Sequence, residues 1–150
     1  MNSIVIHTAV DLSGVLPEFG GFLGDLRFYM GLFLLVGPLV MLALGAWMFF
    51  RPIPTATYKA GYRTYFGMGS KAAWRFTQWL AGLVWGSVGA LLTVVMIVVC
   101  IVLGSMDANA AVNACLTWLI VEASVALAAF LTVEISVAVR FDSKGKLRKK

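Results

Sequence analysis

Long apolar stretches alternate with short polar ones along this chain. Residues 28–50 and 79–103 carry no charged side chain, and residues 111–139 carry only the carboxylates of Glu122 and Glu134. Each stretch reaches or exceeds the roughly 20 residues that an α-helix needs to cross the hydrocarbon core of a bilayer. The pattern predicts an all-α fold, a bundle of three transmembrane helices within residues 28–139.

The second apolar stretch carries a stripe of small and weakly polar residues. Ser70 is the predicted N-cap of its helix, which is expected to begin at Lys71. Spacings of three, four or seven residues place one set of side chains on a single face: Arg75, Gln78, Gly82, Gly86, Gly89, Thr93 and Cys100. In lipid, such a face indicates close packing against protein on one side. Packing within the chain and a homodimer contact through Gly82 and Gly86 both remain open.

Composition and charge support a membrane protein and predict its orientation. Hydrophobic residues make up 61% of the chain and charged residues 13%, against about 45–50% and 25% in soluble domains. Nearly all Lys and Arg residues lie in the loop 51–78 and the tail 140–150. The positive-inside rule therefore predicts that both are cytoplasmic, without any role for nucleic acid, and that segment 1–27 is non-cytoplasmic. The tail is expected to contact anionic membrane lipids.

A polar spot is predicted near the middle of the membrane. Pro38 removes a backbone donor and frees the carbonyl of Leu34, and Thr93 and Glu122 fall at a similar depth. A carboxyl group inside the bilayer is costly and usually faces protein or water. Glu122 is therefore expected to hydrogen-bond with Thr93 or with the Leu34 carbonyl. It serves either as a buried neutral acid that holds the bundle together or as a relay for protons or a ligand.

The second intramembrane carboxylate, Glu134, lies close to the predicted cytoplasmic boundary. There it is expected to pair with an arginine, since a bidentate arginine contact is strong and directional. Arg63 and Arg75 are the favoured partners, and Arg51 is a further candidate.

Signatures of enzyme chemistry are absent from the sequence. There is no His or Cys cluster for a metal, no nucleophile elbow and no phosphate-binding loop. We therefore expect a protein without catalytic residues, cofactors or metal ions. Cys100 and Cys115 flank the turn between the last two stretches, and we expect two small buried residues rather than a disulfide.

The loop before the second stretch carries a recognisable motif. Gly61-Tyr62-Arg63-Thr64 is followed by Ser70 and Trp74 and preceded by Pro54. This arrangement over residues 54–82 resembles the SdpI family of bacterial membrane proteins. The chain departs from the family pattern after the proline, where Ala56 and Thr57 stand in place of an expected asparagine.

The resemblance implies a multi-pass protein of the bacterial cell membrane that gives immunity to a secreted, membrane-active peptide or protein toxin. It also implies signalling through capture of a cytoplasmic repressor. In this interpretation Gly61 allows a tight turn, Arg63 binds a carboxylate or lipid phosphate, and Trp74 sets the depth of the loop. The loop 51–78, which includes Arg75, binds the acidic surface of a partner. Two alternatives remain: a small transporter or channel subunit, homo-oligomeric and using Glu122, and an accessory subunit of a larger complex.

Overall fold

The computed structural model describes residues 16–51, 53–54 and 61–148, with side chains from residue 26 onward. Residues 1–15 of the predicted non-cytoplasmic segment, the Ala56–Thr57 pair and the last two lysines of the tail lie outside this range. The described elements are helix α1 (Leu16–Phe50), the short 3-10 helix η2 (Gly67–Gly69), helix α2 (Lys71–Leu103) and helix α3 (Ala108–Arg140).

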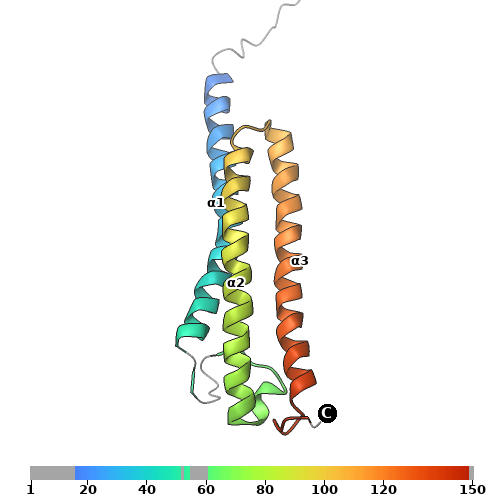
Figure 1. Cartoon of the computed structure of the whole chain (residues 1–150). Helices are drawn as coiled ribbons and strands as arrows, with labels where there is room; N and C mark the ends of the chain where they lie inside the picture. The colour runs from blue at the N-terminus through green and yellow to red at the C-terminus, as the bar shows by residue number, and fades with distance from the viewer. Residues whose placement is uncertain (1–15, 52, 55–60, 149–150) are drawn as a thin grey trace, which may run out of the picture.

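Three helices run side by side along one long axis (Figure 1). All three are long and apolar enough to cross a membrane, over Leu26–Phe50, Lys71–Leu103 and Ala108–Arg140. Large apolar side chains point outward from each of them, as Phe28, Ile101 and Val139 do. The prediction of an all-α fold with three helices long and apolar enough to span a membrane is therefore confirmed. α1 begins at Leu16, well before the predicted start of the first span at Phe28.

The loop after α1 and the C-terminal tail lie at the same end of the bundle, which we call the basic end (Figure 1). The start of α1 and the turn between α2 and α3 lie at the opposite end. α2 begins at the basic end, and Ser70 is its N-cap, as predicted. The Ser70 hydroxyl accepts a hydrogen bond from the Ala73 N–H at 3.1 Å. This bond satisfies one of the unpaired N–H groups that every helix start leaves open.

Glycine lets α1 and α2 approach each other backbone to backbone. A Cβ added to Gly82 would lie 2.6 Å from the Phe49 nitrogen, and one added to Gly45 would collide with the Gly86 backbone. Gly89 meets the backbone of Leu42 in the same way. The small-residue stripe thus packs against protein on one side, as predicted, and its partner is α1 of the same chain.

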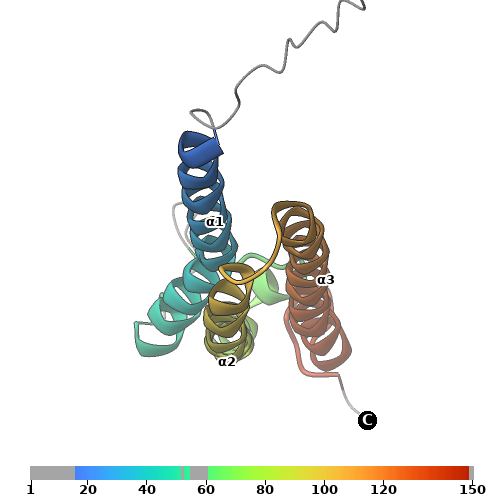
Figure 2. The same cartoon turned by 90° about the horizontal axis from the view of Figure 1, so that it is seen from above.

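α1 bends where Pro38 interrupts it. The two halves of the helix run in different directions when the bundle is seen from above (Figure 2), and the half after Pro38 diverges from α3. Proline has no N–H to donate and its ring crowds the preceding turn, so a bend is the expected result. Pro38 itself is buried, and the helix resumes on its far side to follow α2.

The two cysteines are both free thiols in the described chain. The Cys100 thiol donates a hydrogen bond to the Gly31 carbonyl at 3.1 Å, and Cys115 is buried in the core cluster between the helices. No disulfide joins them, as expected, but only Cys115 is fully buried, and Cys100 is partly exposed.

We predict that Gly45→Ala destabilises the protein by about 1–3 kcal/mol, because its methyl group would overpack the contact with Gly86. Gly86→Ala is the matched control, since its added Cβ would lie 3.6 Å from the nearest atom of Gly45, an ordinary contact. Both changes raise helix propensity equally. The thermal unfolding midpoint in detergent, followed by circular dichroism, measures the difference. Equal midpoints would contradict the close contact.

Candidate functional site

Gln78 fixes the loop that precedes α2. Its side chain is fully buried, and its amide faces the backbone of Tyr62. The Tyr62 N–H donates to Oε1 of Gln78 at 3.0 Å, and Nε2 of Gln78 donates to the Tyr62 carbonyl at 2.7 Å. A single amide side chain thus replaces the strand or helix partner that these two backbone groups would otherwise need.

Trp74 holds the same loop from a second direction. Its indole Nε1 donates to the Ile53 carbonyl at 2.8 Å, and its side chain is only 1% exposed. Gly61 adopts a positive φ of 107°, and a Cβ there would lie 2.7 Å from the Trp74 ring. Gly61 thus has the backbone conformation that the predicted tight turn would need. The Trp74 side chain is buried inside the protein, and its predicted role in setting the depth of the loop stays a prediction.

Thr64 binds the first residue of the short helix η2. Its buried hydroxyl accepts the N–H of Gly67 at 2.7 Å. Gly67 lies directly against the hydroxyls of Thr64 and Thr77, where a larger residue would not fit. Gly61, Tyr62, Thr64 and Trp74 of the predicted motif are therefore joined in one small, packed unit.

The C-terminal tail folds onto this unit. Residues 141–147 form a tight hairpin with an antiparallel bridge between Phe141 and Leu147. Oδ1 of Asp142 accepts the backbone N–H groups of Lys144 and Lys146 at 2.9 Å and 2.7 Å. Gly145, with φ 68°, lies against the backbone of Gly69 and Ser70, and its carbonyl accepts the Ser70 hydroxyl at 2.7 Å.

Two basic side chains of this region stack on aromatic rings. The Arg140 guanidinium lies 4.5 Å from the centroid of Phe76, and that of Arg148 lies 6.0 Å from the centroid of Phe66. Nε of Arg148 also donates to the Phe141 carbonyl. We call the assembly of residues 61–70, residues 71–78 of α2 and residues 141–148 the cap.

The cap exposes a basic surface. Arg63 and Arg75, the two arginines predicted to bind a partner, are both exposed. Three lysines of the cap are exposed as well: Lys71, Lys144 and Lys146. The side chain of Tyr65 is 75% exposed. The structure thus separates the motif into residues that build the cap and arginines that it presents.

A second cluster lies beneath the cap, where the loop meets α2 and α3. The ring of Tyr62 lies 6.0 Å from the centroids of both Trp85 and Phe130. Burial, and then the nearby Glu134 carboxylate, raise the pKa of Tyr62 above its ordinary value of 10.0. Glu134 therefore lies near Tyr62, and its pairing with Arg63 or Arg75 stays a prediction.

Glu122 meets the proline kink in the middle of the bundle. Its Oε2 would lie 3.2 Å from a Cβ added to Gly37. Its Oε1 is buried and has no hydrogen-bond partner in the part of the chain that is described. The Thr93 hydroxyl donates to the Gly89 carbonyl of its own helix at 2.7 Å, so the predicted bond to Glu122 does not form. Serine and threonine hydroxyls in helices often bond to the carbonyl four residues earlier, and this bond competes with more distant partners.

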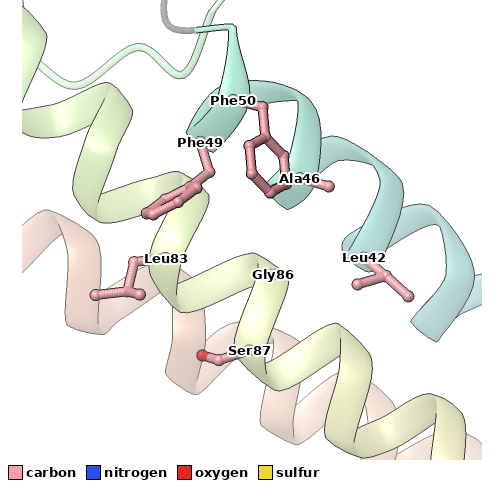
Figure 3. A pocket seen from close by; sticks show the side chains of 8 residues that line it. Leu42, Ala46, Phe49, Phe50, Leu83, Gly86 and Ser87 are labelled. Carbon is pink, nitrogen blue, oxygen red and sulfur yellow. The ribbon is translucent and has the colours of Figure 1, made fainter.

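An apolar pocket of about 230 Å³ lies where α1 and α2 cross near the basic end. Phe49 and Phe50 of α1 face Leu83 and Ser87 of α2 across it (Figure 3). The Ser87 hydroxyl donates to the Val84 carbonyl of its own helix at 3.2 Å. The lining therefore suits lipid chains and offers no free donor to select a polar ligand.

Some of these features were not expected from the sequence. The spacing of Gln78 predicts only a place on the stripe of α2 and does not reveal its bonds to Tyr62. The charge of the tail predicts only a basic segment. Asp142 and Gly145 were an available signal for the hairpin, because Asp and Gly at this spacing are typical of turns.

Comparison of the chain with protein-family models, curated proteins and solved structures finds no match.

We predict that Gln78→Leu loosens the cap, because both backbone groups of Tyr62 lose their partner. Each unpaired buried group costs about 1–3 kcal/mol. Limited trypsin digestion should cut at Arg63 faster, and the unfolding midpoint should fall. Ser87→Ala, which removes an exposed hydroxyl elsewhere on α2, serves as the control and should change neither result.

We predict that Tyr62 makes stability fall at alkaline pH. Its folded pKa is raised, so the unfolded chain loses this proton first, and stability decreases as the pH rises above the ordinary value of 10.0. Unfolding midpoints measured from pH 8 to 12 should fall less steeply for Tyr62→Phe than for the native chain. Tyr65→Phe, at an exposed tyrosine, is the control. Parallel pH profiles for Tyr62→Phe and the native chain would contradict this role of Tyr62.

Proposed function

We propose that this chain is a membrane protein of the SdpI type that gives its bacterial host immunity to a secreted, membrane-active toxin. The observation that carries the proposal is the clamp of Gln78 on Tyr62, which fixes the backbone next to Arg63. The motif residues from Gly61 to Trp74 belong to one packed cap, and they hold Arg63 on a defined frame.

The cap is suited to binding an acidic partner. Its backbone is held by side chains of α2 and of the tail, so little ordering is needed when a partner binds. Arg63 and Arg75 are exposed on this frame, together with Lys71 of α2 and two lysines of the hairpin. Complementary charge favours rapid association with an acidic surface and disfavours basic partners. Capture of a cytoplasmic repressor would use this surface.

Charge supports the orientation in which the cap is cytoplasmic. The loop and the tail carry most of the basic residues and lie at one end of the bundle. Positive segments next to membrane helices are retained on the cytoplasmic side. In this orientation the opposite end and the lipid-facing helix surfaces are available to a toxin that arrives from outside.

A small transporter or channel subunit is the second candidate, and Glu122 favours it. An intramembrane carboxylate oxygen without a partner is a frequent feature of ion and proton pathways. The side chains that surround it are apolar, however, and such a lining suits a water-filled path poorly. Loss of proton or solute flux in Glu122→Gln vesicles would favour this candidate over immunity.

We predict that deletion of the gene makes its host sensitive to its own secreted products. Culture supernatant of the native strain should then inhibit the deletion strain, and the native gene should restore growth. Arg63→Ala and Trp74→Ala should not restore it, because the first removes the presented charge and the second the support of the loop.

The control for this assay is Arg51→Ala, which removes an exposed arginine at the same end but outside the cap. It should protect as well as the native chain, at equal amounts of protein in the membrane. Full protection by Arg63→Ala would contradict the role of the cap, and resistance of the deletion strain would contradict immunity itself.

A further inference from the structure

A cavity of about 290 Å³ lies between α1 and α3 at the proline kink. Gly37, Pro38 and Met41 of α1 line one side, Glu122 and Ala123 of α3 line the other, and Leu92 of α2 completes it. Gly37 and Ala123 are exposed on the outside of the bundle. Because this surface lies within the membrane-crossing part of the helices, the cavity is reached sideways from the lipid.

Glu122 is the one polar side chain among the residues that line this cavity. Its Oε1 is buried without a partner among the described residues, which is costly for an acid in hydrocarbon. Two donors on α2 are used within the chain, because the Thr93 hydroxyl binds the Gly89 carbonyl and the Cys100 thiol binds the Gly31 carbonyl. A donor supplied from outside the chain would satisfy this oxygen.

The depth of the cavity decides which molecule can supply that donor. Glu122 lies near the middle of α3 (Ala108–Arg140), and Gly37 lies near the middle of the span Leu26–Phe50. Lipid amines stay in the head-group region, roughly 15 Å from the centre of a bilayer whose core is about 30 Å thick. A side chain on a membrane-spanning peptide reaches the centre directly.

The size of the cavity limits what enters it. Its volume of about 290 Å³ is at the lower end of the roughly 300–1,000 Å³ typical of small-molecule sites. It accepts one long side chain and not a whole helix. A lysine matches both parts of the lining, since its apolar stem covers hydrophobic surface and its ammonium group makes a charge-assisted hydrogen bond to a carboxylate.

We propose that this cavity is a lateral binding site for a membrane-spanning peptide that carries a lysine at mid-bilayer depth. The lysine stem lies against Gly37, Met41 and Leu92, and its ammonium group donates to Glu122. The site is inferred from the cavity and the unpartnered oxygen alone. The further step of identifying such a peptide with the toxin of the immunity proposal rests on the proposed function.

Synthetic peptides test the proposal with the full chain in phosphatidylcholine vesicles. The probe is a fluorescent Leu/Ala peptide that spans the bilayer and carries one central lysine, and its match has leucine there. Energy transfer from the labelled protein measures binding. We expect the lysine peptide to bind the native chain at least about tenfold more tightly, which corresponds to roughly 1.4 kcal/mol.

Two variants remove the site in different ways. Glu122→Leu removes the acceptor and should abolish the preference for lysine. Ala123→Leu fills the entrance from an exposed position and should weaken binding while the acid remains. Circular dichroism and gel filtration check that both variants fold. Glu134→Gln removes the other acid of α3, outside this cavity, and should keep the preference, and a peptide with its lysine moved to one end should bind like the leucine peptide.

Three outcomes would overturn the proposal. These are equal binding of the two peptides, a lysine preference that survives in Glu122→Leu, and association of labelled copies of the chain that depends on Glu122 and excludes the lysine peptide. The last outcome would identify a second copy as the occupant. The assay uses no toxin and no cap residue, so its result is independent of the deletion assay for immunity.

Discussion

The contact between the backbones of α1 and α2 is the constraint on which the rest of the structure depends. In lipid, apolar side chains gain nothing by leaving hydrocarbon for one another, so helices associate through close packing and hydrogen bonds. Gly45, Gly82 and Gly89 allow that packing here. Because α1 follows α2 after its bend at Pro38, it diverges from α3 over its second half, and the cavity beside Glu122 lies where this divergence begins.

The fold was predictable from the sequence because hydrocarbon imposes a simple rule on the backbone. A chain that crosses it must satisfy its own N–H and C=O groups, so long apolar stretches become helices. The N-cap of α2 at Ser70 and the packed face of its small residues follow from equally local patterns. The early start of α1 at Leu16 was missed because hydropathy marks the membrane core and not the end of a helix.

The details of the candidate site were less predictable, because they depend on contacts between distant residues. Gln78 is a stripe residue by spacing, and only the returning loop makes it the partner of Tyr62, sixteen residues earlier. Trp74 resembles an interfacial anchor in sequence, but the same loop buries it. The sequence predicts a bond from Thr93 to Glu122, whereas the Thr93 hydroxyl donates to the Gly89 carbonyl of its own helix. Such choices are made by geometry in three dimensions, which spacing along one helix does not contain.

The Ser70 hydroxyl links the start of α2 to the last residues of the chain. It accepts the Ala73 N–H and donates to the carbonyl of Gly145, seventy-five residues later. The ribosome makes that glycine only after all of α3 has been synthesised. A chain that stops before Gly145 therefore lacks this contact with the start of α2. The surface at the basic end is therefore a property of the whole bundle, and no single helix carries it.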